Sequence, residues 1–190
     1  MNIGILALQG AFAEHAAMLD RLGAAHFEIR QPRDLERTLD GLILPGGEST
    51  AMRKLLQDLE LFEPLRQRIL GGLPVFGTCA GLILLASSVE GGTPCFGTMD
   101  LAVRRNAYGR QLSSFYTEEA FDGKQIPMTF IRAPQILSAG PAVRILARAR
   151  GQIVAAQQAG QLVSAFHPEL SHCVTIHQHF LEMVQRRQVR

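Results

Sequence analysis

The sequence predicts an α/β fold: a doubly wound, mostly parallel sheet flanked by helices, with a few antiparallel strands inserted. In the first half of the chain, short apolar runs alternate with segments whose apolar residues recur at helical spacing. Strands and helices that alternate with short connections are typical of parallel βαβ units. In the second half, strand candidates follow one another with only turn-like residues between them, which predicts the antiparallel insertion.

The first half opens with an expected strand at residues 3–8, an apolar run ended by Gln9-Gly10, as in a strand buried on both faces. Residues 12–23 carry Phe12, Ala16 and Leu19 at helical spacing, which predicts an amphipathic helix. Further strands are expected at residues 41–44 and 74–77, and helical cover over residues 55–65 and 80–88.

The second half contains five short strand candidates, at residues 101–103, 128–131, 143–147, 153–156 and 162–166. A closing helix is expected from about residue 173 to 187, with Ile176, Phe180 and Met183 on one stripe. No repeat or linker divides the chain, and 190 residues suit one domain, so we expect a single domain over 1–190.

Composition excludes several classes of function. Hydrophobic residues make up 47% and charged residues 19%, which argues against a disordered chain. The net charge of +2 is too mild for binding nucleic acid through phosphate neutralisation. No apolar run is long enough to span a membrane. Three cysteines without a secretion signal suit free thiols in a reducing cytoplasm.

The sharpest motif is Gly77-Thr78-Cys79-Ala80-Gly81, between an expected strand and an expected helix. It has the form Gly-x-nucleophile-x-Gly, the elbow that holds a nucleophile in a strained turn. The N-terminus of the following helix would favour the thiolate of Cys79. The alternative is a buried core cysteine without chemistry.

A base and its orienting group are both present in His167-Pro168-Glu169, directly after an apolar run. Residues i and i+2 of an extended segment point to the same side, so Glu169 could hold the His167 ring. Pro168 disfavours a helical conformation at His167. The alternative is a surface turn with an unrelated glutamate. Because reactive groups gather at the carboxyl ends of strands in doubly wound sheets, the elbow and His167 can share one edge.

The segment 45–50, Pro-Gly-Gly-Glu-Ser-Thr, follows another expected strand. Paired glycines let the backbone approach a ligand, and the amides of Gly46 and Gly47 could bind an oxyanion together with that of Ala80. The alternative is a simple turn before a helix capped by Ser49 or Thr50. No Gly-Lys-Ser/Thr follows, so a nucleotide phosphate loop is excluded.

Other candidates are weaker. No metal site is expected, because there is no Cys-x-x-Cys pattern and two of the C-terminal histidines cannot converge on a helix. Solvated or capping roles are expected for His172, His177 and His179, and apolar packing for Cys95 and Cys173. Arg105 is either a surface arginine or a bidentate clamp for a substrate carboxylate.

Together these motifs resemble the class I (triad) glutamine amidotransferases. Within that superfamily the chain is similar to the glutaminase subunits of pyridoxal 5′-phosphate synthase. The segments that carry this resemblance span residues 8 to 170: 8–11, 44–50, 76–82, Arg105-Asn106, 109–111, 130–134 and 166–170. Ser171 stands where the family pattern often has Thr.

The resemblance implies hydrolysis of L-glutamine to glutamate and ammonia through a glutamyl thioester. It implies that Cys79 is the nucleophile, His167 the base and acid, and Glu169 the orienter. The residues that it implies for binding glutamine, largely through backbone, are Gly47, Glu48, Ser49, Arg105, Ile131 and Arg132. The expected oxyanion donors are the amides of Gly46, Gly47 and Ala80, with Gly10 as a further candidate.

The resemblance also implies a partner and no bound cofactor. The ammonia would pass to a separate synthase protein with a (β/α)₈ barrel fold, which joins it to ribose 5-phosphate and glyceraldehyde 3-phosphate. Pyridoxal phosphate is then the product of the complex, and glutaminase activity depends on docking with that synthase subunit. Two rival hypotheses remain: another elbow-cysteine hydrolase of the same fold, and a non-catalytic binding protein.

Overall fold

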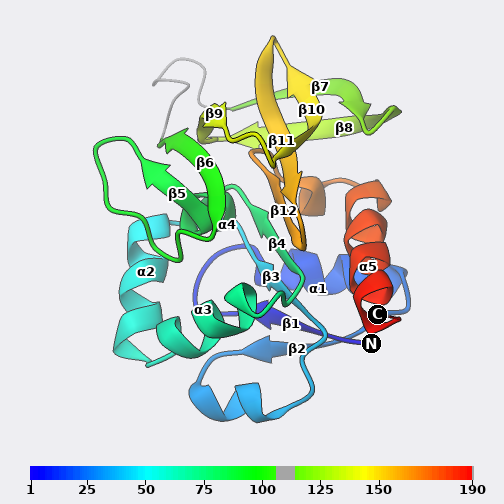
Figure 1. Cartoon of the computed structure of the whole chain (residues 1–190). Helices are drawn as coiled ribbons and strands as arrows, with labels where there is room; N and C mark the ends of the chain where they lie inside the picture. Colours follow the sequence, from blue (N-terminus) through cyan, green and yellow to red (C-terminus); the bar gives the residue numbers. More distant parts are fainter. Residues whose placement is uncertain (106–113, 190) are drawn as a thin grey trace.

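The computed structural model describes residues 1–105 and 114–189, which form a 12-stranded sheet with helices packed against it (Figure 1). Asn106 and the 109–111 segment, which contribute to the family resemblance, lie outside the described residues. The expected α/β class, with a parallel sheet and an antiparallel insertion, is confirmed.

The parallel part of the sheet has the strand order β2-β1-β3-β4-β12. All four pairings in this series are parallel. These strands are β1 (Asn2–Leu6), β2 (Ala25–Ile29), β3 (Gly41–Leu44), β4 (Val75–Thr78) and β12 (Gln161–Ser164). Every residue of β3 and β4 is buried, because helices cover both faces, and this explains their uninterrupted apolar sequences.

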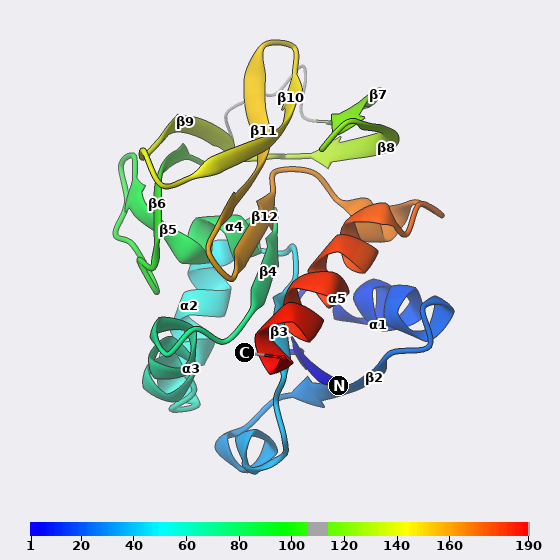
Figure 2. The ribbon, with the colours of Figure 1, turned by 45° about the vertical axis from the view of Figure 1, so that its right-hand side comes forward.

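Helices flank the parallel strands on both faces (Figure 2). On one face lie α1 (Phe12–Arg21) and α5 (Thr175–Gln188), and on the other α2 (Ser49–Asp58) and α3 (Phe62–Leu70). The single stretch of helical cover expected over residues 55–65 is therefore two helices. The break follows α2 at Glu60, whose φ of 56° lies in the left-handed region. A short 3₁₀ helix, η1 (Pro32–Glu36), connects β2 to β3.

The antiparallel part continues the same sheet as β12-β11-β10-β7-β8 and forms the upper half of the molecule in Figure 1. A branch of β5, β6 and β9 joins it through β11. These strands are β5 (Ala86–Val89), β6 (Met99–Arg104), β7 (Ser114–Phe121), β8 (Lys124–Ile131), β9 (Gln135–Ala139), β10 (Arg144–Ala149) and β11 (Gln152–Gln158).

Four strands are absent from the expectations: β2, β5, β7 and β9. None of them is a continuous apolar run, since β7 alternates exposed and half-buried residues and β5 has two exposed serines. The helix expected over 80–88 is also too long. It ends as α4 (Ala80–Leu85), and the next residues form β5, which pairs with β6.

Membrane-spanning helices are not found in residues 1–105 and 114–189: none of their helices has both the length and the apolar composition needed to cross a bilayer.

Candidate active site

A cleft of about 350 Å³ opens at the carboxyl ends of the parallel strands. Because β1, β3, β4 and β12 run in the same direction, the loops that follow them meet at one edge of the sheet. Residues from these loops, from the first turns of helices α2 and α4, from the end of β8 and from the residue after β6 line the cleft: Gln9, Gly47, Glu48, Ser49, Cys79, Ile83, Arg105, Ile131, Arg132 and His167.

Cys79 lies at the junction of β4 and α4, in the strand–turn–helix context that its motif predicts. Its φ of 48° and ψ of −97° are a strained conformation for a residue with a side chain. The N–H of Cys79 donates a hydrogen bond of 2.8 Å to the Ser164 carbonyl of β12, which fixes the turn. The residue is largely buried, and its Sγ lies 3.9 Å from the Ile131 carbonyl oxygen.

The glycines of the elbow are required by close packing. A Cβ on Gly81 would lie 2.0 Å from the Leu44 carbonyl oxygen of β3. A Cβ on Gly77 would lie 2.7 Å from the carbonyl carbon of Gly81. Helix α4 can therefore lie close to β3 because Gly81 lacks a side chain, and close to β4 because Gly77 lacks one.

The His167 ring is held by Glu169, as the motif predicts. His167 Nδ1 lies 2.7 Å from Glu169 Oε1, and both residues are buried. The backbone differs from the expected extended segment, because Pro168 and Glu169 begin a 3₁₀ turn, η2 (Pro168–Leu170). This turn brings the carboxylate back to the ring, while the His167 N–H donates to the Thr129 carbonyl of β8.

His167 also interacts with the Cys79 side chain. Burial acts to lower the pKa of His167, but the hydrogen bonds with Cys79 and Glu169, together with their charges, raise it to about 10. At neutral pH the ring therefore carries a proton that it can give to a leaving group. The Pro-Gly-Gly loop lies against both side chains: a Cβ on Gly46 would be 2.4 Å from His167 Cε1 and 3.5 Å from Cys79 Cβ.

Glu48 caps helix α2, in place of the cap at Ser49 or Thr50 that a simple turn would require. Its carboxylate accepts hydrogen bonds from the N–H groups of Thr50 (3.0 Å) and Ala51 (2.7 Å). The hydrogen bond from the Thr50 N–H stabilises the charged carboxylate and is the largest cause of the lowered pKa of Glu48. The side chain is thus engaged by its own helix, whereas the backbone at Gly47 faces the cleft.

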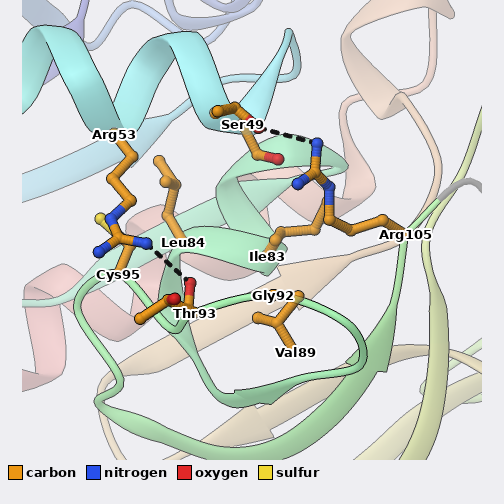
Figure 3. A pocket seen from close by; sticks show the side chains of 10 residues that line it. Ser49, Arg53, Ile83, Leu84, Val89, Gly92, Thr93, Cys95 and Arg105 are labelled. Atoms are coloured by element: carbon orange, nitrogen blue, oxygen red, sulfur yellow. Dashed lines mark hydrogen bonds between the residues drawn. The ribbon is translucent and has the colours of Figure 1, made fainter.

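Arg105 lies beside this cap. Its Nη2 is 3.2 Å from Glu48 Oε1 and 2.9 Å from Thr50 Oγ1. Figure 3 shows Arg105 at one side of a smaller neighbouring cavity of about 80 Å³, with Arg53 and Cys95 at the other side. Arg105 therefore lines both cavities, and its guanidinium is within reach of a group bound in the cleft.

A model of the SNO glutamine amidotransferase family matches residues 5–186 of the chain. The chain belongs to this family.

Relatives of this SNO family chain are similar over nearly the full length of both proteins. A protein named pyridoxal 5′-phosphate synthase subunit PdxT, from Methanocorpusculum labreanum, is 60% identical over 97% of this chain and 98% of its own. A protein of the same name from Streptococcus pneumoniae is 57% identical over 98% of this chain and 100% of its own.

Solved structures give the same fold for this SNO family chain. A structure described as a glutamine amidotransferase superposes with a TM-score of 0.91 at 41% identity, covering 96% of this chain and 98% of its own. A glutamine amidotransferase from Thermotoga maritima superposes with a TM-score of 0.62 at 13% identity, covering 99% of this chain and 86% of its own, a likeness of fold alone.

The cleft of this SNO family chain brings together most of the residues singled out from the sequence. Cys79, His167 and all six residues expected to bind glutamine line it, and Glu169 lies behind His167. The lining also includes Gln9 and Ile83, for which the motifs predict no role. Gln9 Oε1 accepts a hydrogen bond of 2.7 Å from the Glu48 N–H. The signals for Gln9 in the sequence are its position at the end of the first apolar run and its place in the 8–11 segment that resembles the family, and neither assigns a role to its side chain.

The other oxyanion candidates, Gly10, Gly46 and Ala80, lie next to the cleft lining rather than in it. Gly10 has a φ of 93°, and a Cβ there would be 1.8 Å from the Gly46 carbonyl oxygen. That oxygen accepts a hydrogen bond of 3.0 Å from the Ala11 N–H, so the loops after β1 and β3 are joined directly. Ala80 is the first residue of α4, where helix geometry leaves the amide without an intrahelical partner.

One expectation about the histidines is wrong. His177 is fully buried, neither solvated nor capping, because its ring packs between Phe76 and His15. His172 is exposed and His179 is half-buried. In residues 1–105 and 114–189 there is no cluster of three or more side chains that could hold a metal ion. The cysteines are free, and Cys95 and Cys173 pack against the core as expected.

Proposed function

We propose that this chain is the glutaminase subunit of a pyridoxal 5′-phosphate synthase, in vitamin B6 biosynthesis. The observation that carries the proposal is the Cys79–His167–Glu169 arrangement at a cleft, in a member of a glutamine amidotransferase family. Relatives named as subunits of that synthase, 57% and 60% identical over nearly the whole chain, support the same assignment. The reaction is hydrolysis of L-glutamine to L-glutamate and ammonia.

In the first half of the proposed reaction, Cys79 Sγ attacks the side-chain amide carbon of glutamine. A C–S bond forms, and the carbonyl oxygen becomes an oxyanion. The proton on His167 then passes to the amide nitrogen, the C–N bond breaks, and ammonia leaves. The product of this half is a glutamyl thioester on Cys79.

In the second half, His167 takes a proton from a water molecule, which attacks the thioester carbon. The C–S bond breaks, glutamate leaves, and Cys79 returns to the thiolate beside the protonated His167 ring. Glu169 holds the ring by the 2.7 Å contact at Nδ1, so that the other ring nitrogen serves Cys79 in both halves.

The α-amino acid end of glutamine is assigned to the far side of the cleft. The Arg105 guanidinium would bind the α-carboxylate of glutamine, which would replace Glu48 as its partner. The Glu48 carboxylate would bind the α-ammonium group. The backbone at Gly47 and Ser49, with Ile131 and Arg132 opposite, completes the cleft. The amides of Gly46, Gly47 and Ala80, together with that of Gly10, are assigned to the oxyanion.

The ammonia is proposed to pass to a synthase protein with a (β/α)₈ barrel fold, which combines it with ribose 5-phosphate and glyceraldehyde 3-phosphate. Pyridoxal phosphate is then the product of the complex and is not held by this chain. No role with nucleic acid or membranes is proposed. The chain is proposed to act in a reducing cytoplasm, and its free cysteines are consistent with that location.

A labelling experiment tests this function. The chain is incubated with a glutamine-analogue electrophile in the presence of the synthase subunit, and the modified peptide is mapped. We expect the label on Cys79, protection by glutamine, and parallel loss of glutamate production. Turnover of peptides without turnover of glutamine would favour another elbow-cysteine hydrolase, and absence of both would favour a non-catalytic binding protein.

A further inference from the structure

A buried cluster of polar side chains lies beneath the proposed triad and takes no part in the reaction described above. His15 of α1 and His177 of α5 are both fully buried, and His15 Nδ1 lies 2.9 Å from His177 Nε2. The other nitrogen of His15, Nε2, lies 3.1 Å from Thr78 Oγ1 and 3.6 Å from Glu169 Oε2. One imidazole thus joins the residue before the nucleophile, the orienting carboxylate and helix α5.

Both rings of this cluster are neutral at neutral pH. Burial lowers the pKa of His177 to about 4. Burial, followed by the nearby His177 and His167, also lowers the pKa of His15 well below its usual value. Each ring therefore carries one N–H, and the hydrogen bond between the two rings requires one nitrogen to donate and the other to accept.

The surroundings decide which nitrogen carries the proton. If His15 Nδ1–H donated to His177, then His177 would carry its own proton on Nδ1, which has no hydrogen-bond partner within residues 1–105 and 114–189. A buried N–H without an acceptor is costly. The same tautomer would turn the bare lone pair of His15 Nε2 toward the Glu169 carboxylate. The favoured arrangement has His177 Nε2–H donating to His15 Nδ1, with the His15 proton on Nε2.

The Glu169 carboxylate has one oxygen that lacks a hydrogen-bond donor. Its Oε1 accepts from His167 Nδ1–H, whereas its Oε2 is buried and has no hydrogen bond from any other described residue. His15 Nε2 is close both to Thr78 Oγ1 and to this oxygen. At 3.6 Å the contact with Oε2 is longer than a hydrogen bond, so it acts through the dipole of the N–H group.

We infer that His15 is a positioning residue for the triad: its Nε2–H, set in place by His177, supports the Glu169 carboxylate in the orientation that holds His167. The inference rests on the proposed glutaminase function. His15 is remote from the substrate, since it is fully buried and does not line the cleft. Loss of its N–H should therefore lower kcat and leave KM unchanged.

The test compares His15→Leu with His15→Gln in the complex with the synthase subunit. His15→Leu removes the donor, and we expect kcat to fall about 10-fold, the scale of one contact to a charged group. His15→Gln places an amide N–H near the former Nε2, and we expect it to restore most of kcat. Leu19→Ala is the matched control, because Leu19 is also buried on α1 but has no polar group.

A double-mutant cycle decides whether His15 acts through Glu169. In a Glu169→Gln background, His15→Leu should cost about twofold or less, because the carboxylate that it supports is already absent. If the His15→Leu protein is not folded, His177→Phe replaces it in the cycle. That variant keeps a ring against Phe76 but removes the donor to His15, and a smaller fall in kcat is expected.

The outcomes separate the inference from the function. A wild-type complex that hydrolyses glutamine, with a His15→Leu variant of equal kcat, overturns the inference and leaves the glutaminase standing. Equal losses of kcat in the two backgrounds also overturn it, because they indicate a general effect on packing. A wild-type complex without glutaminase activity overturns the proposed function and this inference with it.

Discussion

At the scale of single residues, the environment of each thiol separates a nucleophile from a structural cysteine. Cys79 lies in a strained turn with a buried imidazole beside it. Cys95 is partly buried against the core, and burial raises the pKa of its thiol to about 11, so it is protonated at neutral pH. Reactivity toward glutamine should therefore belong to Cys79.

Replacing Cys79 by Ala should abolish glutaminase activity, because no other atom in the cleft can form the thioester. A loss on the order of 10⁴-fold or more is the scale for a triad nucleophile. Glutamate production by the complex measures it, and Cys95→Ala is the matched control, expected to remain active. Equal losses in the two variants would show that the wrong thiol has been assigned.

Replacing Arg105 by Ala should raise the KM for glutamine more than it lowers kcat. The reason is that a cation for the substrate carboxylate acts equally in the ground state and the transition state. Steady-state kinetics at saturating synthase subunit measure the two constants. Arg53→Ala is the control, since Arg53 lines the neighbouring cavity but not the cleft, and its side chain donates to the Thr93 carbonyl. A folded Arg105→Ala variant with an unchanged KM would show that Arg105 does not bind the substrate.

At the scale of elements, the elbow depends on how closely α4 approaches β3. A Cβ on Gly81 would overlap the Leu44 carbonyl oxygen, a backbone atom that cannot move alone. Gly81→Ala should therefore lower the free energy of unfolding by about 3 kcal/mol, as overpacking of a core does. Urea unfolding measures it. Gly160→Ala meets only ordinary contacts and should change stability by less than about 0.5 kcal/mol; equal effects would contradict the steric argument.

The elements also show what the sequence could predict. Strands β3 and β4 are predictable because burial on both faces leaves a continuous apolar run. Strand β7 is not, because its alternate residues are half-buried and its pairing with β8 supplies the regularity. The break between α2 and α3 also escapes the pattern, since the apolar spacing continues through Leu59 and Phe62 while Glu60 turns the chain.

The same reasoning applies to the site. Cys79, His167 and Glu169 are predictable because each lies in a local motif, and strand ends in a parallel sheet meet at one edge. Gln9 and His15 are not, because their partners Glu48 and Glu169 are distant in sequence, and only the folded sheet brings them together.

At the scale of the whole molecule, buried imidazoles make the free energy of unfolding depend on pH, on both the acid and the alkaline side of pH 6.5. The pKa of His177 is lowered to about 4 by burial, so between pH 6.5 and 4 the unfolded chain binds a proton that the folded chain does not. His15 acts in the same direction. The pKa of His167 is raised to about 10 by Cys79 and Glu169 against the effect of burial, so the folded chain holds the extra proton between pH 6.5 and 10.

Stability should therefore be greatest near pH 6.5 and decrease on both sides. Urea unfolding from pH 5 to 9 measures this, and each group contributes a slope of up to about 1.4 kcal/mol per pH unit. His177→Phe should flatten the acid side, and His167→Asn the alkaline side. Unchanged slopes in both variants would show that other groups set the dependence.

Docking of the synthase subunit should fix the orientation of the peptide N–H groups that are assigned to the oxyanion. The amides assigned to the oxyanion lie largely in two loops joined through the Ala11–Gly46 hydrogen bond, and glycine leaves their peptide orientations soft enough for a partner to fix them. If docking turns one N–H toward the oxyanion, kcat should rise by about 10²–10³-fold, the scale of restoring one such donor.

We therefore expect the isolated chain to hydrolyse glutamine slowly or not at all, and addition of the synthase subunit to raise kcat far more than it changes KM. Glutamate production with and without that subunit measures this, with Cys79→Ala in both arms as the blank. Equal rates would contradict the dependence on docking, and the triad assignment would stand on the labelling of Cys79.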